Sequence, residues 1–186
     1  MGVLTKKFFT PMEYLKLEEK SETKHEYRDG IVVPMAGSTA NHDRLVGRTD
    51  LLLRNTLDKK DCEVFTSNMR VQVKASGLYT YPDVTVVCGK VEFAKGRNDT
   101  ITNPTLIGEV LSASTRTYDR GRKFDLYRAL KSLQAYMLID QEQMRVEYFR
   151  KLKDGTWELE EYTQPRDKVK IHALDVALSL ADTNTM

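Results

Sequence analysis

The most informative hydrophobic segment is residues 105–111 (TLIGEVL), in which five of seven positions are apolar or glycine. An apolar run of this length is typical of a central strand that is covered on both faces. Its one charged residue is Glu109. An ionised carboxylate inside a protein is costly unless a cation or a metal ion pairs with it. Side chains that converge on Glu109 are therefore the first candidates for a functional site.

The N-terminal part predicts a helix, a hairpin and a second helix. Thr10 and Glu13 have the spacing of a capping box, with proline at the first helical position between them. Residues 25–33 read as a hairpin whose two-residue turn is an Asp-Gly pair. Ser38 or Thr39 can cap the second helix, in which leucines recur at helical spacing.

After the second helix the pattern changes to strands, with one further helix. The expected elements are strands at residues 62–65, 69–74, 81–88, 105–111 and 133–140, a helix at 118–131, and a hairpin of 145–149 with 156–162. A strand, a helix and a strand in succession favour a parallel crossover within a mixed sheet. Residues 1–186 are expected to form one domain, with a frayed tail at 182–186.

Composition narrows the class of protein without identifying a partner. Charged residues make up 30% and hydrophobic residues 40% of 186 residues, and the net charge is +2, which is ordinary for a globular protein. Any DNA contact would need a local basic patch. No apolar run approaches a membrane span, so we expect a cytoplasmic protein. Cys62 and Cys88 form no CxxC pair, which suggests free thiols in a reducing compartment and no zinc framework.

Lys123 is the first candidate partner of Glu109. On a helical wheel of about 100° per residue, Tyr127 and Leu130 share the face of Lys123, which therefore points towards the sheet. Asp119, one turn earlier, is placed to pair with it. The alternative is a lysine that buries its stem and extends its ammonium group to solvent.

Asp83 is the second candidate, because it follows Pro82 at the start of a predicted strand. Alone it would be read as a turn or capping residue. Together, Asp83 and Glu109 supply the oxygen ligands that a hard divalent ion such as Mg²⁺ prefers. With a nearby ammonium group, this combination is typical of metal-assisted phosphodiester hydrolysis.

Four sequence blocks in this order resemble the Uma family of restriction endonucleases, which is grouped with the PD-(D/E)XK nucleases. The blocks are residues 81–88 (YPDVTVVC), 108–115 (GEVLSAST), 119–127 (DRGRKFDLY) and 132–140 (SLQAYMLID). The resemblance extends over nearly the whole chain. It implies a restriction-endonuclease-like three-layer α/β/α fold with a mixed central sheet.

The resemblance also implies roles for individual residues. Asp83 and Glu109 would be ligands of Mg²⁺ or Mn²⁺, with the backbone carbonyl of Val110 as a third ligand. Leu111 stands where the superfamily's strand places a lysine, and the family is thought to move that lysine to the following helix, here Lys123. Asp83, Glu109 and Lys123 would thus form the catalytic set.

Further residues are placed at the edge of this site. Glu26 corresponds to an acidic residue that often completes the site in such nucleases, and His42 lies in a matching Asn-His-Asp. Arg116, Arg120 and Arg122 could contact a DNA backbone, although a solvated basic face explains them nearly as well.

Three functions are consistent with these residues. The first is a divalent-metal-dependent DNA endonuclease, for which a homodimer would suit double-strand cleavage. The second is a nuclease-fold protein that binds nucleic acid or a partner without cutting. The third is a structural homodimer in which Glu109 and Lys123 form a buried ion pair.

Overall fold

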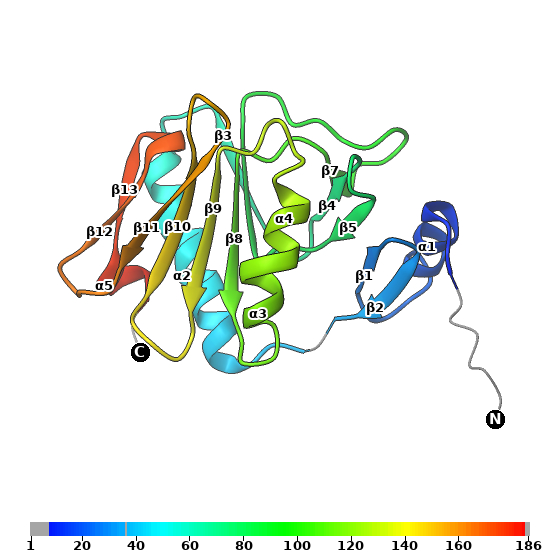
Figure 1. The fold of residues 1–186 in the computed structure, drawn as a ribbon, viewed down its shortest axis with the longest axis horizontal. Helices are drawn as coiled ribbons and strands as arrows, with labels where there is room; N and C mark the ends of the chain where they lie inside the picture. The colour runs from blue at the N-terminus through cyan, green and yellow to red at the C-terminus, as the bar shows by residue number, and fades with distance from the viewer. Residues whose placement is uncertain (1–7, 36, 185–186) are drawn as a thin grey trace.

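The computed structural model describes residues 8–35 and 37–184. Its centre is a six-stranded mixed sheet with the order β11-β10-β9-β8-β6-β3 (Figure 1). The strands are β3 (Cys62–Thr66), β6 (Val84–Cys88), β8 (Leu106–Leu111), β9 (Ala135–Asp140), β10 (Val146–Lys151) and β11 (Trp157–Tyr162). Only β8 and β9 are parallel neighbours in this sheet, and the crossover between them carries the helix predicted after Glu109.

Helices lie on both faces of this sheet, which confirms the predicted α/β class with a mixed sheet (Figure 1). One face is covered by α2 (Ala40–Leu57), whose N-cap is Thr39. The opposite face is covered by a continuous helical segment in three parts. These are α3 (Arg116–Tyr118), the π-helical turn η1 (Asp119–Lys123) and α4 (Phe124–Tyr127).

A second sheet of five short strands, in the order β2-β1-β5-β4-β7, flanks the face that carries η1 and α4. Its strands are β1 (His25–Arg28), β2 (Ile31–Pro34), β4 (Arg70–Val73), β5 (Leu78–Thr80) and β7 (Thr100–Ile101). Helix α1 (Pro11–Glu18) carries the predicted capping box of Thr10 and Glu13. Its buried Tyr14 packs on Tyr27 and Tyr79, so α1 is fixed to this small sheet.

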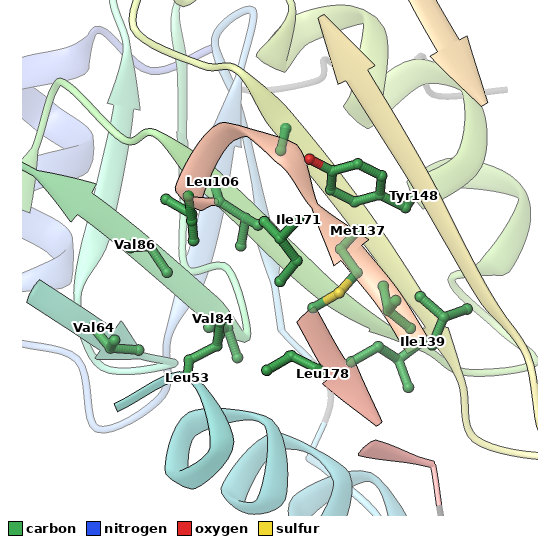
Figure 2. Packing of buried hydrophobic residues seen from close by; sticks show 14 of the residues in the cluster. Leu53, Val64, Val84, Val86, Leu106, Met137, Ile139, Tyr148, Ile171 and Leu178 are labelled. Carbon is green, nitrogen blue, oxygen red and sulfur yellow. The ribbon is translucent and has the colours of Figure 1, made fainter. Parts of the chain in front are cut away.

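The C-terminal segment closes the core on the α2 side. It contains β12 (Lys168–Ile171), the 3₁₀ turn η2 (His172–Leu174), β13 (Val176–Ser179) and α5 (Leu180–Thr183). Figure 2 shows Ile171 and Leu178 beside Leu53 of α2 and Met137 of the central sheet. The C-terminal segment therefore packs against the body of the protein. The expectation of a frayed tail is wrong up to Asn184, because Thr183 and Asn184 are buried; residues 185–186 lie outside the described residues.

Two of the expected elements have other bounds in the structure. The strand expected at residues 81–88 begins at Val84, and the helix expected at 118–131 runs instead from Arg116 to Tyr127. Among the described residues, no helix combines the length and apolar character that a membrane crossing requires.

The expectation of free thiols is wrong, because Cys62 and Cys88 form a disulfide. The two residues are directly opposite each other on the antiparallel strands β3 and β6, which brings their Cα atoms to 4.0 Å. Strand register, and not sequence spacing, creates this contact. The two cysteines therefore do not indicate a reducing compartment, and a cytoplasmic location stays a prediction.

Candidate active site

Strand β8 directs Glu109 towards the η1 and α4 face of the central sheet. Side chains alternate along a strand: Leu106 and Val110 pack in the core on the α2 side, whereas Ile107 and Leu111 pack on the other. Glu109 is two residues from both Ile107 and Leu111, so its side chain points to the same face of the sheet as theirs. The residue is 4% exposed. Its carboxylate is therefore inside the protein, between the sheet and the crossover segment.

Lys123 reaches Glu109 from the π-helical turn above the sheet. Its Nζ lies 2.7 Å from Oε1 of Glu109 and 3.4 Å from Oδ1 of Asp119, and the residue is 5% exposed. The expectation that Lys123 faces the sheet and pairs with Asp119 is confirmed, and the alternative of a solvated ammonium group is wrong. Leu111, where the superfamily places lysine, is buried in the same core.

Asp83 lies at the end of β6, next to Glu109 of β8. The antiparallel register of these strands runs to Val84 opposite Gly108, so one further step places Asp83 opposite Glu109. Here a side-chain hydrogen bond continues the backbone pairing of the two strands. Oδ2 of Asp83 accepts a hydrogen bond of 2.8 Å from the Val110 N–H. The same oxygen lies 3.1 Å from Nε2 of His42 on α2.

Each of the two carboxylates is held through one oxygen. Oε1 of Glu109 accepts a hydrogen bond of 2.8 Å from the Tyr127 hydroxyl in addition to the contact with Lys123. Both contacts of Asp83, with the Val110 N–H and with His42, likewise fall on one oxygen, Oδ2. Each of the two carboxylates is therefore oriented by two partners within the protein.

Glu26 of β1 approaches the cluster of Asp83, Glu109 and Lys123 from the small sheet. It is 8% exposed and accepts hydrogen bonds from the Tyr118 hydroxyl and, at 3.0 Å, from the Thr80 hydroxyl. The Tyr118 ring is in turn covered by the guanidinium group of Arg28, 4.6 Å from the ring centroid. The structure thus brings Glu26 near Lys123, whose pKa it helps to raise.

Burial and local charge shift the pKa values of these groups. Burial raises the pKa of Glu109 to about 8; Lys123 opposes the rise, and Asp83 and Asp119 add to it. Burial acts to lower the pKa of Lys123, but Glu109, Asp119 and Glu26 outweigh it and hold that pKa well above its usual range. Burial also raises the pKa of Tyr127 well above its usual value, so its hydroxyl remains a donor.

The donor set fits a hard divalent ion with few protein ligands. Carboxyl groups outnumber the ammonium group here, since Glu26, Glu109 and Asp119 act on Lys123, and Asp83 acts on Glu109. In the described part of the chain, no three His, Cys, Asp or Glu side chains are arranged to hold a metal ion. Two carboxylate oxygens plus the Val110 carbonyl would leave the remaining positions to water, as Mg²⁺ tolerates.

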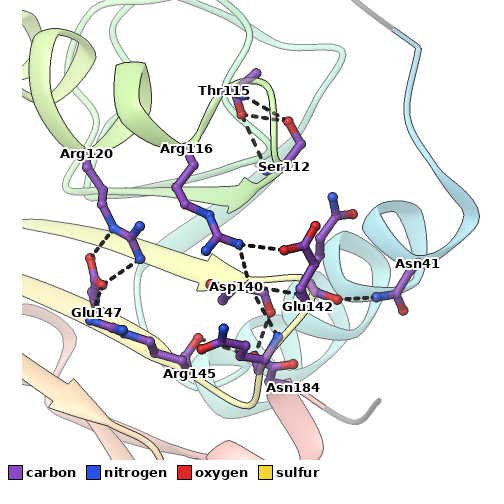
Figure 3. A network of polar contacts seen from close by, with 12 residues as sticks. Asn41, Ser112, Thr115, Arg116, Arg120, Asp140, Glu142, Arg145, Glu147 and Asn184 are labelled. Carbon is purple, nitrogen blue, oxygen red and sulfur yellow. Dashed lines mark hydrogen bonds and ion pairs between the residues drawn. The ribbon is translucent and has the colours of Figure 1, made fainter.

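The three arginines that sequence reasoning assigned to phosphate contacts differ in their availability. Arg116 pairs with Asp140 and Glu142, and Arg120 makes two hydrogen bonds to Glu147, as Figure 3 shows. The side chain of Arg122 is 61% exposed and lies 3.4 Å from Asp29. Arg122 is therefore the most accessible of the three to a DNA backbone.

The hydroxyl groups that follow β8 have a local role. Oγ of Ser112 accepts a hydrogen bond of 3.2 Å from the Thr115 N–H and contacts the Ser114 and Thr115 hydroxyls. These contacts form a turn directly before α3. Thr115, the N-cap of α3, makes no side-chain cap hydrogen bond to that helix.

Metal-free protein should lose stability as the pH rises from about 5 to about 8. Glu109 keeps its proton to a pKa of about 8 in the folded state and to its ordinary value of 4.5 in the unfolded state. Because the folded state binds more protons between these values, its free energy of unfolding falls with pH, by at most about 1.4 kcal/mol per unit. His42, whose pKa is raised by its hydrogen bond to Asp83, acts in the same direction. Urea unfolding in chelator at several pH values measures the slope.

Glu109→Gln provides the control for this pH dependence, because it removes the titrating group and retains the shape of the side chain. The slope should become much shallower in this variant. An equally steep slope would show that other groups cause it.

Comparison with solved structures identifies the fold. The chain superposes on the "Crystal structure of a putative nuclease belonging to DUF820 from Anabaena variabilis" with a TM-score of 0.74. The match covers 92% of this chain and 95% of that chain at 19% sequence identity. The chain therefore has the α/β fold of this nuclease-like class.

Sequence comparison identifies the family. The Uma2 family, described as "Putative restriction endonuclease", matches residues 11–182, and the chain belongs to it. The "Uncharacterized protein sll1609" of Synechocystis is 41% identical over 87% of this chain and 91% of its own length. The "Uncharacterized protein slr1290" of the same organism is 37% identical over 92% of this chain and 88% of its own length.

Proposed function

We propose that the protein is an endonuclease that hydrolyses DNA phosphodiester bonds with Mg²⁺ or Mn²⁺ as its cofactor. One observation carries the proposal. Asp83, directly before β6, lies opposite Glu109 of β8, and each carboxylate is oriented by two protein partners beside the buried Lys123. Membership of the Uma2 family supports the same reaction class.

Each residue of the cluster would have its own role in such a reaction. Asp83, Glu109 and the Val110 carbonyl would hold the metal, which supplies Lewis-acid stabilisation of phosphoryl oxygen and lowers the pKa of a bound water. Lys123 has three N–H donors, and its ion pairs with Glu109 and Asp119 leave it able to hold an attacking water or a phosphate oxygen.

Residues around the cluster fix this geometry and contact the substrate. His42 and the Val110 N–H hold one oxygen of Asp83, which orients the other. Glu26 contributes negative charge from the small sheet, and Arg122 is exposed enough to meet a phosphate. A homodimer would present one site to each DNA strand, and we include it in the proposal.

A plasmid-nicking assay tests the proposed function. Supercoiled plasmid should be converted to nicked or linear DNA by wild-type protein with Mg²⁺ or Mn²⁺, and excess chelator should stop the conversion. Protein that neither binds these ions nor cuts DNA under any of these conditions would refute the proposal.

A second candidate is a nuclease-fold protein that binds nucleic acid without cutting it. The displaced lysine keeps this candidate open, because Leu111 stands where the superfamily's strand places lysine and Lys123 is paired with Glu109 and Asp119. DNA binding that needs no metal and is unchanged in Glu109→Ala, without cleavage, would favour this candidate.

A further inference from the structure

The Tyr127 hydroxyl is a buried group with a specific target. Tyr127 is fully buried in the core between the central sheet and α4, where an apolar side chain would be expected. Its hydroxyl donates a hydrogen bond of 2.8 Å to Oε1 of Glu109. Sequence reasoning placed Tyr127 on the apolar face of this helix and assigned it no role in the site.

Tyr127 and Lys123 act on the same atom. Nζ of Lys123 lies 2.7 Å from Oε1 of Glu109, and the two donors come from positions one helical turn apart on the same face. Both are buried, and the ring of Tyr127 is fixed by packing on Tyr136 at 5.6 Å between centroids. Oε1 is therefore bound by two donors.

We infer that Tyr127 is a positioning residue for a divalent cation: with Lys123 it fixes Oε1 of Glu109, so that Oε2 is the oxygen presented to the ion. The inference rests on the proposed function. Asp83 is held in a comparable way, since the Val110 N–H and His42 occupy its Oδ2. Loss of a hydrogen bond that orients a metal ligand typically lowers metal affinity or activity about 10–100-fold.

The competing interpretation is that Tyr127 merely fills the core and satisfies its hydroxyl on the nearest acceptor. Tyr136 offers a matched control for this interpretation. It is fully buried in the same core, and its hydroxyl donates a hydrogen bond of 3.0 Å to the backbone carbonyl of Asp119, not to a carboxylate. Tyr127→Phe and Tyr136→Phe each remove one buried hydroxyl and keep the ring.

Binding of Mn²⁺ alone, followed by electron paramagnetic resonance in the absence of DNA, separates the two interpretations. Tyr127→Phe should weaken Mn²⁺ binding about tenfold or more, the size seen when partners of metal ligands are removed. Tyr136→Phe should bind Mn²⁺ like the wild type. Thermal unfolding of both variants shows that each is folded before binding is compared.

Two outcomes would overturn the inference alone: Tyr127→Phe binds Mn²⁺ as tightly as the wild type, or both variants lose affinity to the same extent. A wild-type protein that binds no Mn²⁺ would overturn the proposed function and the inference together. These results are distinguishable, because the first two require a wild type that binds the ion.

Discussion

Glu109→Gln should abolish metal-dependent cleavage, with a loss of about 10³-fold or more in rate, because several kcal/mol of transition-state stabilisation disappear with the metal site. The amide retains the shape of the carboxylate, and its oxygen can still accept a hydrogen bond from Tyr127 or Lys123. Its neutral oxygen is a weaker ligand for a hard divalent ion than a carboxylate, because it carries no negative charge. Plasmid nicking and Mn²⁺ binding should therefore fail together in a folded protein.

The matched control is Glu63→Gln, which removes one negative charge from an exposed position on the edge strand β3. This variant should cut like the wild type. Because both variants lose one negative charge, a difference between their cleavage rates cannot come from net charge. Cleavage by Glu109→Gln at the wild-type rate would show that the chemistry lies elsewhere. Loss of folding in Glu109→Gln, seen by circular dichroism, would move the test to Asp83→Asn.

Lys123→Met should have the second large effect, on cleavage and on stability. Removing one partner of a buried ion pair costs about 3–5 kcal/mol when the other charge stays behind. Here the cost should be smaller at pH 6 than at pH 9, because Glu109, with its pKa already raised to about 8, can take a proton. Cleavage should fall by about 10²-fold or more, the size seen when one donor to a developing charge is lost.

The double variant Glu109→Gln with Lys123→Met separates a functional site from a structural ion pair. Whether the pair belongs to a functional site or is only structural, the stability of the double variant should return towards that of the wild type, because no unpaired charge remains buried. If the pair is only structural, wild-type protein will show no stabilisation by Mg²⁺. A metal site predicts that Mg²⁺ raises the unfolding temperature of the wild type and not that of the double variant.

The sequence predicted those features that are determined by residues close together in the chain. The Asp29–Gly30 turn, in which both residues have positive φ, and the Thr10 capping box follow from neighbouring residues alone. The orientation of Lys123 was also predictable, because helical periodicity places it with Tyr127 and Leu130. These features need no knowledge of which strands pair.

Features that depend on strand register were not predictable from the sequence. The Cys62–Cys88 disulfide and the placement of Asp83 opposite Glu109 both follow from the pairing of β6 with its two neighbours. The π-helical turn also escaped prediction, since the apolar pattern of residues 118–131 is read with an α-helical period. Tyr127 escaped because a tyrosine among apolar residues indicates core packing, and only its hydroxyl contact reveals another role.

The most direct measurement is a crystal structure of the protein soaked in Mn²⁺, with the ion located from its anomalous scattering. We predict one ion bound by Oε2 of Glu109 and Oδ1 of Asp83, each within about 2.5 Å, with Lys123 still on Oε1. No ion between these carboxylates at a saturating Mn²⁺ concentration, or an ion bound only elsewhere, would contradict it.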